Sequence, residues 1–135
     1  MITGKYLQFY KELLKITDSK NLLHDSLSTL AFGTDASFYR LIPKLIVKVH
    51  NEEELCLVMK KAAEMKIPLT FRAAGTSLSG QAVTDSVLVI ATHGWKRHQI
   101  LEDGKKIKLQ AGIRGTNANN YLVKYGKKIG PDPAS

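Results

Sequence analysis

The sequence predicts an α+β fold in which a small parallel β-α-β sheet is followed by a β-hairpin, with helices flanking both. Two patterns carry this prediction. Short apolar, β-branched runs alternate with one amphipathic helical segment in the middle of the chain. An Asp-Gly pair then separates two further strand-like runs. The 135 residues, 44% of them hydrophobic, suit one domain with a real core.

The N-terminal part is predicted to be helical. Its apolar residues recur at helical spacing, which makes residues 6–16 an amphipathic helix; they are Tyr6, Phe9, Tyr10, Leu13 and Leu14. Residues 21–24 are expected to add a helical turn, and residues 31–37, rich in turn formers, to form a loop. We therefore divide the chain into an N-terminal helical segment, 1–31, and a main unit, 32–135.

The centre of the chain carries the sheet. Residues 45–49 are predicted to form a strand, and Asn51 to cap a helix that the proline at 68 brings to an end. Residues 68–71 and 86–91 follow as the second and third strands. A strand-helix-strand unit of this length predicts a right-handed parallel crossover. Cys56, the single cysteine, lies in the helical pattern and is expected to be a buried structural thiol.

The last third is predicted to form a hairpin and a helix. Residues 98–101 and 106–111 flank the Asp103-Gly104 turn, which favours a tight primed turn. Residues 117–125 are expected to form a helix with Gly126 at its C-cap. The sequence then ends on a rigid Pro-Asp-Pro segment with no closing element, so we expect the domain to be truncated at its C-terminus.

The charge is strongly positive and unevenly spread. The net charge is +8; residues 96–135 hold 9 Lys and Arg against 3 Asp and Glu. Such an excess suits phosphate-bearing ligands, nucleic acid, a solvated face or an acidic partner segment, and charge alone leaves these open. Trp95, beside two basic residues, is expected to cap the core rather than to stack on bases.

Several classes of protein are disfavoured. No apolar run approaches the ~20 residues of a membrane-spanning helix, and the N-terminus lacks a signal-peptide pattern, so we expect a cytoplasmic protein without a transmembrane segment. No cluster of Cys and His has metal-ligand spacing, so no metal site is expected.

The stretch after the second strand carries the chemistry. Ala73 to Ser77 contains only small side chains, which let a backbone approach a ligand closely. Successive N–H groups in such a turn form a concave donor site for phosphate oxygens. It is neither a Walker loop nor the G-x-G-x-x-G fingerprint. Composition alone leaves an ordinary strand-helix turn open.

The exact string adds a resemblance. Residues 72–81, R-A-A-G-T-S-L-S-G-Q, are similar to the R-G-G-G-T-S-L-S-G-Q loop of FAD-linked oxidases of the vanillyl-alcohol-oxidase or PCMH type, close to the glycolate oxidase and D-lactate dehydrogenase group. Three more segments resemble that family in the same order: F-G-T-D-A-S at 32–37, the strand at 43–49, and Y-G-K-K-I-G-P-D-P-A-S at 125–135. The resemblance covers about residues 32–135.

The resemblance implies the N-terminal subdomain of the PCMH-type FAD-binding fold, in which FAD lies between two α+β subdomains. The pyrophosphate would be held mainly by main-chain N–H groups of this loop, and the C-terminal segment would line the flavin. The implied cofactor-binding residues are Arg72, Ala73, Ala74, Gly75, Thr76, Ser77, Leu78, Gly80, Gln81, Pro131 and Ser135. Arg72 could touch a phosphate or anchor the loop to a carbonyl, and both stay open.

The resemblance also implies the chemistry of the whole protein. FAD would be non-covalent, because Thr76 stands where some relatives carry a flavin-linked histidine. The intact enzyme would oxidise a small 2-hydroxy acid. The implied partners are FAD, that substrate and the remainder of the same polypeptide, with no nucleic acid. No catalytic residue is expected in these 135 residues, which alone would be inactive, and an iron–sulfur cluster is possible only in downstream domains.

The loop differs from the family pattern at two positions. Ala73 and Ala74 replace two family glycines, and alanine costs about 1 kcal/mol wherever a positive φ is needed.

Two other functions are rival hypotheses. One is a non-catalytic basic module that binds nucleic acid or a phosphorylated ligand, and the other is a purely structural interaction domain.

Overall fold

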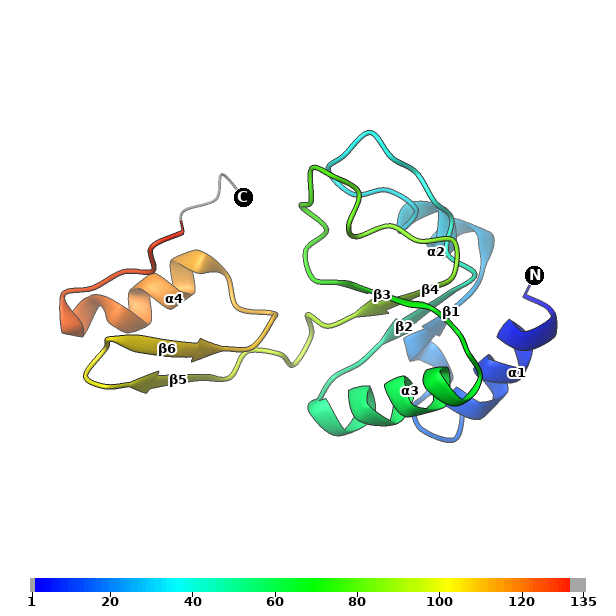
Figure 1. The fold of residues 1–135 in the computed structure, drawn as a ribbon, viewed down its shortest axis with the longest axis horizontal. Helices are drawn as coiled ribbons and strands as arrows, with labels where there is room; N and C mark the ends of the chain where they lie inside the picture. The colour runs from blue at the N-terminus through cyan, green and yellow to red at the C-terminus, as the bar shows by residue number, and fades with distance from the viewer. Residues whose placement is uncertain (1, 132–135) are drawn as a thin grey trace.

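The computed structural model describes residues 2–131 and places them in two lobes (Figure 1). The sheet lobe, residues 2–95, holds a four-stranded sheet with helices on both sides. The hairpin lobe, residues 96–131, holds a two-stranded hairpin packed on one helix. The elements are α1 (Gly4–Leu13), β1 (Leu22–Leu23), α2 (Ser26–Ala31), β2 (Leu45–Lys48), α3 (Glu52–Glu64), β3 (Leu69–Arg72), β4 (Val87–Ile90), β5 (His98–Leu101), β6 (Lys106–Leu109) and α4 (Gly115–Leu122), with 3₁₀ turns at Ser19–Asn21 and Val123–Tyr125.

The sheet has the order β1-β2-β4-β3. The predicted β2-α3-β3 unit is present, but its two strands are not neighbours, because β4 lies between them and runs parallel to both. All four residues of β4 are buried. That position explains why 87–90 is a continuous apolar run, since a central parallel strand is covered on both faces. The predicted α+β class, parallel sheet and separate hairpin are confirmed.

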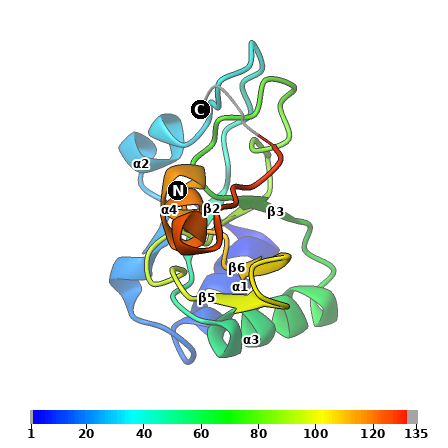
Figure 2. The same ribbon diagram turned by 90° about the vertical axis from the view of Figure 1, so that its left-hand side faces the viewer.

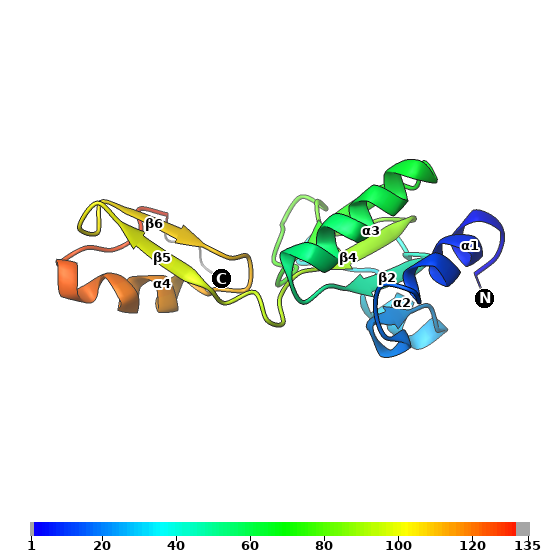
Figure 3. The same ribbon diagram turned by 90° about the horizontal axis from the view of Figure 1, so that it is seen from below.

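The two faces of the sheet are covered by different helices. Val47, Val87 and Val89 point to one face, where they pack with α1 and α3 in the main core. Ile46, Leu88 and Ile90 point to the other face and form a smaller cluster with Phe32 at the end of α2. Figure 3 shows α3 and α2 on opposite sides of the strands. Because alternate side chains of each strand point to opposite faces, the sheet forms the middle of three layers, with α1 and α3 on one side and α2 on the other.

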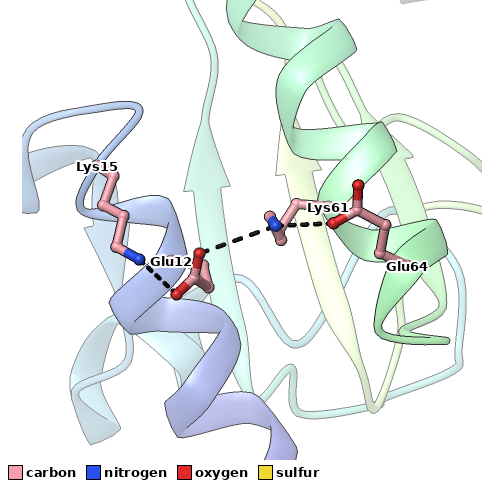
Figure 4. A network of polar contacts seen from close by, with 4 residues as sticks. All are labelled: Glu12, Lys15, Lys61 and Glu64. Carbon is pink, nitrogen blue, oxygen red and sulfur yellow. Dashed lines mark hydrogen bonds and ion pairs between the residues drawn. The ribbon is translucent and has the colours of Figure 1, made fainter.

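Helix α1 is docked by its apolar face. Phe9 and Leu13 are fully buried in the main core, beside Val58 of α3. A surface network joins the same two helices, in which Lys61 bonds Glu64 at 2.7 Å and lies 3.8 Å from Glu12 (Figure 4). The hydrogen bond from Lys15 lowers the pKa of Glu12. These charged groups are exposed and screened by water, so they stabilise the fold little. The buried apolar side chains therefore hold α1 against the core.

Two local expectations need correction, those for residues 21–24 and for Cys56, and a further helix, α2, is present. Residues 21–24 do not form a helical turn: a 3₁₀ turn ends at Asn21 and strand β1 follows, pairing with β2. Residues 26–31 form α2, capped by Asp25, whose carboxylate accepts from the Ser28 amide at 2.8 Å. Cys56 is exposed rather than buried. On α3 the fully covered positions are Val58 and Ala62, and the helix turns Cys56 away from them.

Asn51 caps α3 as predicted, and its side chain accepts from the Glu54 amide at 2.8 Å. The helix ends before the proline at 68. Lys66 has a positive φ, +52°, and the Ile67 amide donates back to the Ala62 carbonyl at 2.9 Å. That bond and the left-handed residue close the helix in the manner of a Schellman motif. The backbone therefore stops the helix first, and the proline follows.

The hairpin lobe also follows its sequence signals. β5 and β6 pair antiparallel, and φ is positive at both Asp103 and Gly104, as a primed turn requires. Gly126 lies in the left-handed region after the last 3₁₀ turn, as predicted. His98 of β5 stacks on Tyr121 of α4, with ring centres 3.7 Å apart, which holds helix against hairpin. Figure 2 shows this lobe in front of the sheet.

Trp95 joins the lobes and caps the core, as predicted. It is 7% exposed, and its indole N–H donates to the Val49 carbonyl at 2.7 Å. Gly112 passes so close to this segment that a Cβ there would lie 2.6 Å from the Trp95 carbonyl oxygen. Only glycine therefore fits at 112. No helix within residues 2–131 is long and apolar enough to cross a membrane.

We expect Trp95→Phe to lower the free energy of unfolding by about 1–3 kcal/mol. Phenylalanine keeps most of the apolar contact but leaves the buried Val49 carbonyl without its donor. Urea unfolding followed by circular dichroism measures the change, with Phe38→Leu, at a fully exposed position, as the control. A Trp95→Phe protein as stable as the parent would contradict this role for the indole N–H.

Candidate functional site

The loop of residues 73–81, which we call the phosphate loop after the ligand predicted from its sequence, begins where β3 ends, at the carboxyl edge of the parallel strands. In the upper part of Figure 1 it lies beside the loop of residues 32–42. The main-chain N–H groups of Ala73, Ala74 and Gly75 donate to no acceptor within the described residues. Backbone donors gathered at this edge of a parallel sheet are placed to bind an anionic ligand.

Glycine is required at position 75 of this loop. Gly75 has a φ of +73°, and a Cβ there would lie 2.3 Å from Nη2 of Arg72. By contrast, the non-glycine residues with positive φ in the described chain are Lys66, Glu102 and Asp103. Ala73 and Ala74 therefore replace the family glycines without backbone strain.

Arg72 anchors the loop. Its Nη1 donates to the Thr34 carbonyl at 2.6 Å and to the Phe32 carbonyl at 3.4 Å, and the guanidinium lies 5.4 Å from the centre of the Phe32 ring. Of the two roles left open by the sequence, the structure shows the anchoring to carbonyl oxygens. The guanidinium closes against Gly75 at the same time, so it joins two loops that are about 40 residues apart in sequence.

Asp35 forms a second bridge between the loops. One carboxylate oxygen accepts from the Ser37 amide at 2.9 Å and from the Ser37 hydroxyl at 2.5 Å, and the other accepts from the Ala82 amide at 3.4 Å. These bonds, that from the Ser37 hydroxyl above all, lower the pKa of Asp35. The local bond could have been predicted from the sequence, because Asp-x-Ser typically forms an Asx turn. The bond to Ala82 could not, because it depends on tertiary structure.

Hydrogen bonds within the loop itself hold its C-terminal end. The Ser77 hydroxyl donates to the Gln81 side-chain oxygen and accepts from the amides of Ser79 and Gln81, both at 3.3 Å. Ser77 and Gln81 thus shape the turn. Gly80, with a φ of +76°, lies against the Tyr39 ring, where a Cβ would be 2.8 Å from a ring carbon. Leu78 is 78% exposed.

A cavity of about 200 Å³ lies between the carboxyl ends of β2, β3 and β4. Ala73 and Ala74 of the phosphate loop line it together with Phe32, Lys48, Val49, His50, Arg72, Ile90, Thr92 and His93. The sequence did not single out Lys48, His50, Thr92 or His93 as lining residues, because their meeting depends on the strand order. Of the predicted site residues, Arg72, Ala73 and Ala74 thus border a cavity with a basic and partly apolar wall.

The two predicted C-terminal residues are placed differently. Pro131 is exposed in the hairpin lobe, two residues after Ile129, whose amide donates to the Asn119 side chain at 2.9 Å. No hydrogen bond in residues 2–131 links Pro131 to the phosphate loop. Ser135 lies outside the described residues. Their contact with a flavin stays a prediction.

We expect the Asp35 bridge to be lost in acid. Because the folded-state pKa of Asp35 is lowered, the bridge stabilises the loop pair at neutral pH, and that contribution disappears as the pH falls through the folded-state pKa. In an NMR titration, the Ser37 and Ala82 amides should shift with one shared midpoint. That midpoint should lie below the midpoint of Asp35 in a short peptide of residues 33–38.

The control for this titration is Asp35→Ala, in which both amides should lose the shared transition. Independent midpoints for Ser37 and Ala82 in the parent protein would show that Asp35 does not join the loops in solution.

Comparison with known proteins agrees with this geometry. A family model described as an FAD binding domain matches residues 43–135. The chain is 26% identical over 117 residues to the glycolate oxidase subunit GlcD of Escherichia coli strain K12, covering 84% of this chain and 23% of that protein. It is 29% identical over 92 residues to the D-lactate dehydrogenase of Archaeoglobus fulgidus, covering 67% and 21%. The chain thus spans about a quarter of the length of these relatives.

Solved structures show the same fold. An alkyldihydroxyacetonephosphate synthase superposes with a TM-score of 0.76 at 20% identity, over 96% of this chain and 27% of that one. Substrate-bound p-cresol methylhydroxylase gives a TM-score of 0.73 at 12% identity, over 93% and 26%. These likenesses confirm the PCMH-type fold, and the matched residues 43–135 include β2 to β4, the phosphate loop and the hairpin lobe. The chain belongs to the family of FAD binding domains.

Proposed function

We propose that the chain is the FAD-holding portion of a larger flavin-dependent oxidoreductase, and that its phosphate loop binds the pyrophosphate of FAD. The observation that carries this proposal is the set of N–H groups at Ala73, Ala74 and Gly75, which donate to no acceptor within residues 2–131 and lie at the carboxyl edge of the sheet. A pyrophosphate presents several acceptor oxygens and a negative charge to such donors. The residues present therefore fit the cofactor that the family implies.

Each part of the site has a separate role in this proposal. The amides of residues 73–75 bind phosphate oxygens, and Arg72 holds their loop in place from the Thr34 carbonyl. The Asp35 bridge and the Tyr39–Gly80 contact fix the neighbouring loop. Bound FAD supplies a hydride acceptor, while this chain supplies its orientation and its charge environment. FAD is held without a covalent bond, with Thr76 where a linking histidine would stand.

For the whole protein we propose oxidation of a small 2-hydroxy acid. The support is that relatives are named glycolate oxidase subunit, D-lactate dehydrogenase and D-2-hydroxyglutarate dehydrogenase, whose named acids all carry a hydroxyl next to the carboxylate. The acid–base residues and the rest of the flavin pocket would come from the remainder of the polypeptide. We also propose a cytoplasmic location, and residues 32–135 as the first FAD-binding subdomain, preceded by the helical segment 1–31.

The test is the visible spectrum of the longer polypeptide that carries this chain. We expect a yellow protein with flavin absorption that bleaches under anaerobic conditions on addition of glycolate or D-lactate. Propionate, which lacks the hydroxyl, should leave the spectrum unchanged and serves as the control. A colourless polypeptide that cannot be reconstituted with FAD would overturn the proposal. A flavoprotein that no 2-hydroxy acid reduces would overturn the substrate class alone.

A further inference from the structure

Two cationic residues stand in one row across the end of the sheet. Lys48 of β2 pairs in register with Ile90 of β4, and Ile90 pairs in register with Arg72 of β3. Side chains that share a register position in adjacent parallel strands point to the same face, here the face of Ile46 and Leu88. With strands ~4.8 Å apart, Lys48 and Arg72 stand roughly 10 Å from each other across Ile90.

Lys48 has no counter-charge in the described chain. It is half-buried, and its ammonium makes no ion pair or hydrogen bond within residues 2–131. A partly desolvated ammonium is costly when it is unpaired, so this position of Lys48 favours a negatively charged ligand. The cavity that Lys48 lines offers none from the protein: its ten lining residues include Lys48 and Arg72 but neither aspartate nor glutamate.

The same cavity carries neutral donors. Ala73 and Ala74 line it, and their main-chain N–H groups are uncommitted within the described residues. Two cationic side chains, main-chain donors and an apolar contact at Ile90 are the features of a site for a phosphate-type anion rather than for a cation or a neutral ring. Nη1 of Arg72 donates to the Thr34 carbonyl, and the positive charge of the guanidinium stays beside the cavity.

We propose that Lys48 is a phosphate-binding residue, which faces Arg72 across Ile90 and closes the cavity around a diphosphate bound to the phosphate loop. This inference rests on the proposed function for the identity of the ligand, which is then the diphosphate of FAD. Lys48 is not evident as a binding residue from the sequence, since a lysine at the end of a strand is ordinarily solvated. The same chemistry would also take a free diphosphate such as ADP, so the test includes both sources.

The experiment is calorimetric titration of the longer polypeptide that carries this chain, in its flavin-free form, with FAD, ADP, inorganic pyrophosphate and riboflavin. The test variant is Lys48→Met, which keeps the apolar stem and removes the charge, and Lys48→Arg restores the charge. The matched control is Lys44→Met, which makes the same charge change at an exposed position just before β2. Circular dichroism and thermal unfolding of each variant establish that the fold is kept.

We expect Lys48→Met to bind FAD, ADP and pyrophosphate about tenfold more weakly, as the loss of one charge-assisted hydrogen bond would produce. Riboflavin, which has no phosphate, should bind the parent and Lys48→Met alike. Lys48→Arg should recover most of the affinity, and Lys44→Met should lose less than about twofold, since an exposed charge is screened.

The outcomes separate the two proposals. If the parent binds FAD and Lys48→Met binds it equally well, the role of Lys48 is overturned and the FAD assignment stands. If the parent binds pyrophosphate in a Lys48-dependent way but not FAD, the anion site is supported and the FAD assignment fails. If the parent binds none of the phosphate ligands, both fail. If Lys48→Met and Lys44→Met weaken binding equally, the effect is one of overall charge and the specific role is overturned.

Discussion

Replacing Gly75 with alanine is expected to weaken FAD binding at least about tenfold and to loosen the phosphate loop. The alanine would carry a φ of +73°, which costs about 1 kcal/mol relative to glycine. Its Cβ would also lie 2.3 Å from the Arg72 guanidinium. The arginine has to move away, and its bond to the Thr34 carbonyl, a charged hydrogen bond of about 1.5–3 kcal/mol, is lost or weakened.

Two other glycines provide controls for this prediction. Gly126 also has a positive φ, +62°, but a Cβ there would meet no atom within 4 Å, so Gly126→Ala reproduces the backbone strain without the clash. Gly130→Ala has neither effect. Fluorescence titration with FAD gives the affinities. If Gly75→Ala and Gly126→Ala bind FAD equally well, the loop does not depend on the contact between Gly75 and Arg72.

The largest loss of stability is expected from Phe9→Ala, about 3–5 kcal/mol in the free energy of unfolding. Phe9 lies in α1 and is fully buried in the main core, so its removal leaves a large cavity between α1 and the sheet. A change of that size approaches the whole stability of a small domain. Chemical unfolding followed by the fluorescence of Trp95 measures the change in the free energy of unfolding. Trp95 belongs to the same cluster as Phe9.

Leu7→Ala is the control on the same helix. Leu7 is 37% exposed, and its truncation should cost less than about 1 kcal/mol. A Phe9→Ala protein that unfolds at the same denaturant concentration as Leu7→Ala would mean that α1 is not part of the cooperative unit. The large effect, in contrast, would show that the N-terminal helical segment is integral to the sheet lobe.

The sequence was sufficient for features encoded by near neighbours. Asn51 with three following glutamates indicated the start of α3, Asp103-Gly104 indicated the primed turn, and Gly126 indicated a helix end; the structure confirms all three. Each depends on a local property, either a side-chain cap or a residue that tolerates a positive φ. The phosphate loop was predicted differently: its small residues left an ordinary turn open, and the exact string of residues 72–81 indicated the phosphate site.

Features that depend on strand order were missed. Leu22–Leu23 is apolar and short, and only its pairing with β2 makes it a strand. Lys48 and Arg72 are 24 residues apart in sequence, yet the insertion of β4 places them in one row. Cys56 lies within the helical pattern of α3, but the sequence does not tell which face of that helix packs on the sheet. Cys56 lies on the exposed face. Local periodicity does not determine these contacts.

The central claim is that the main-chain amides of residues 73–75 hold the diphosphate of FAD. The most direct measurement is a ¹H–¹⁵N NMR titration of the longer, flavin-free polypeptide with FAD, with riboflavin as the phosphate-free comparison. The account predicts that the amide signals of Ala73, Ala74 and Gly75 shift and saturate together with FAD and stay in place with riboflavin. Saturable FAD binding that leaves those three signals unmoved would contradict it.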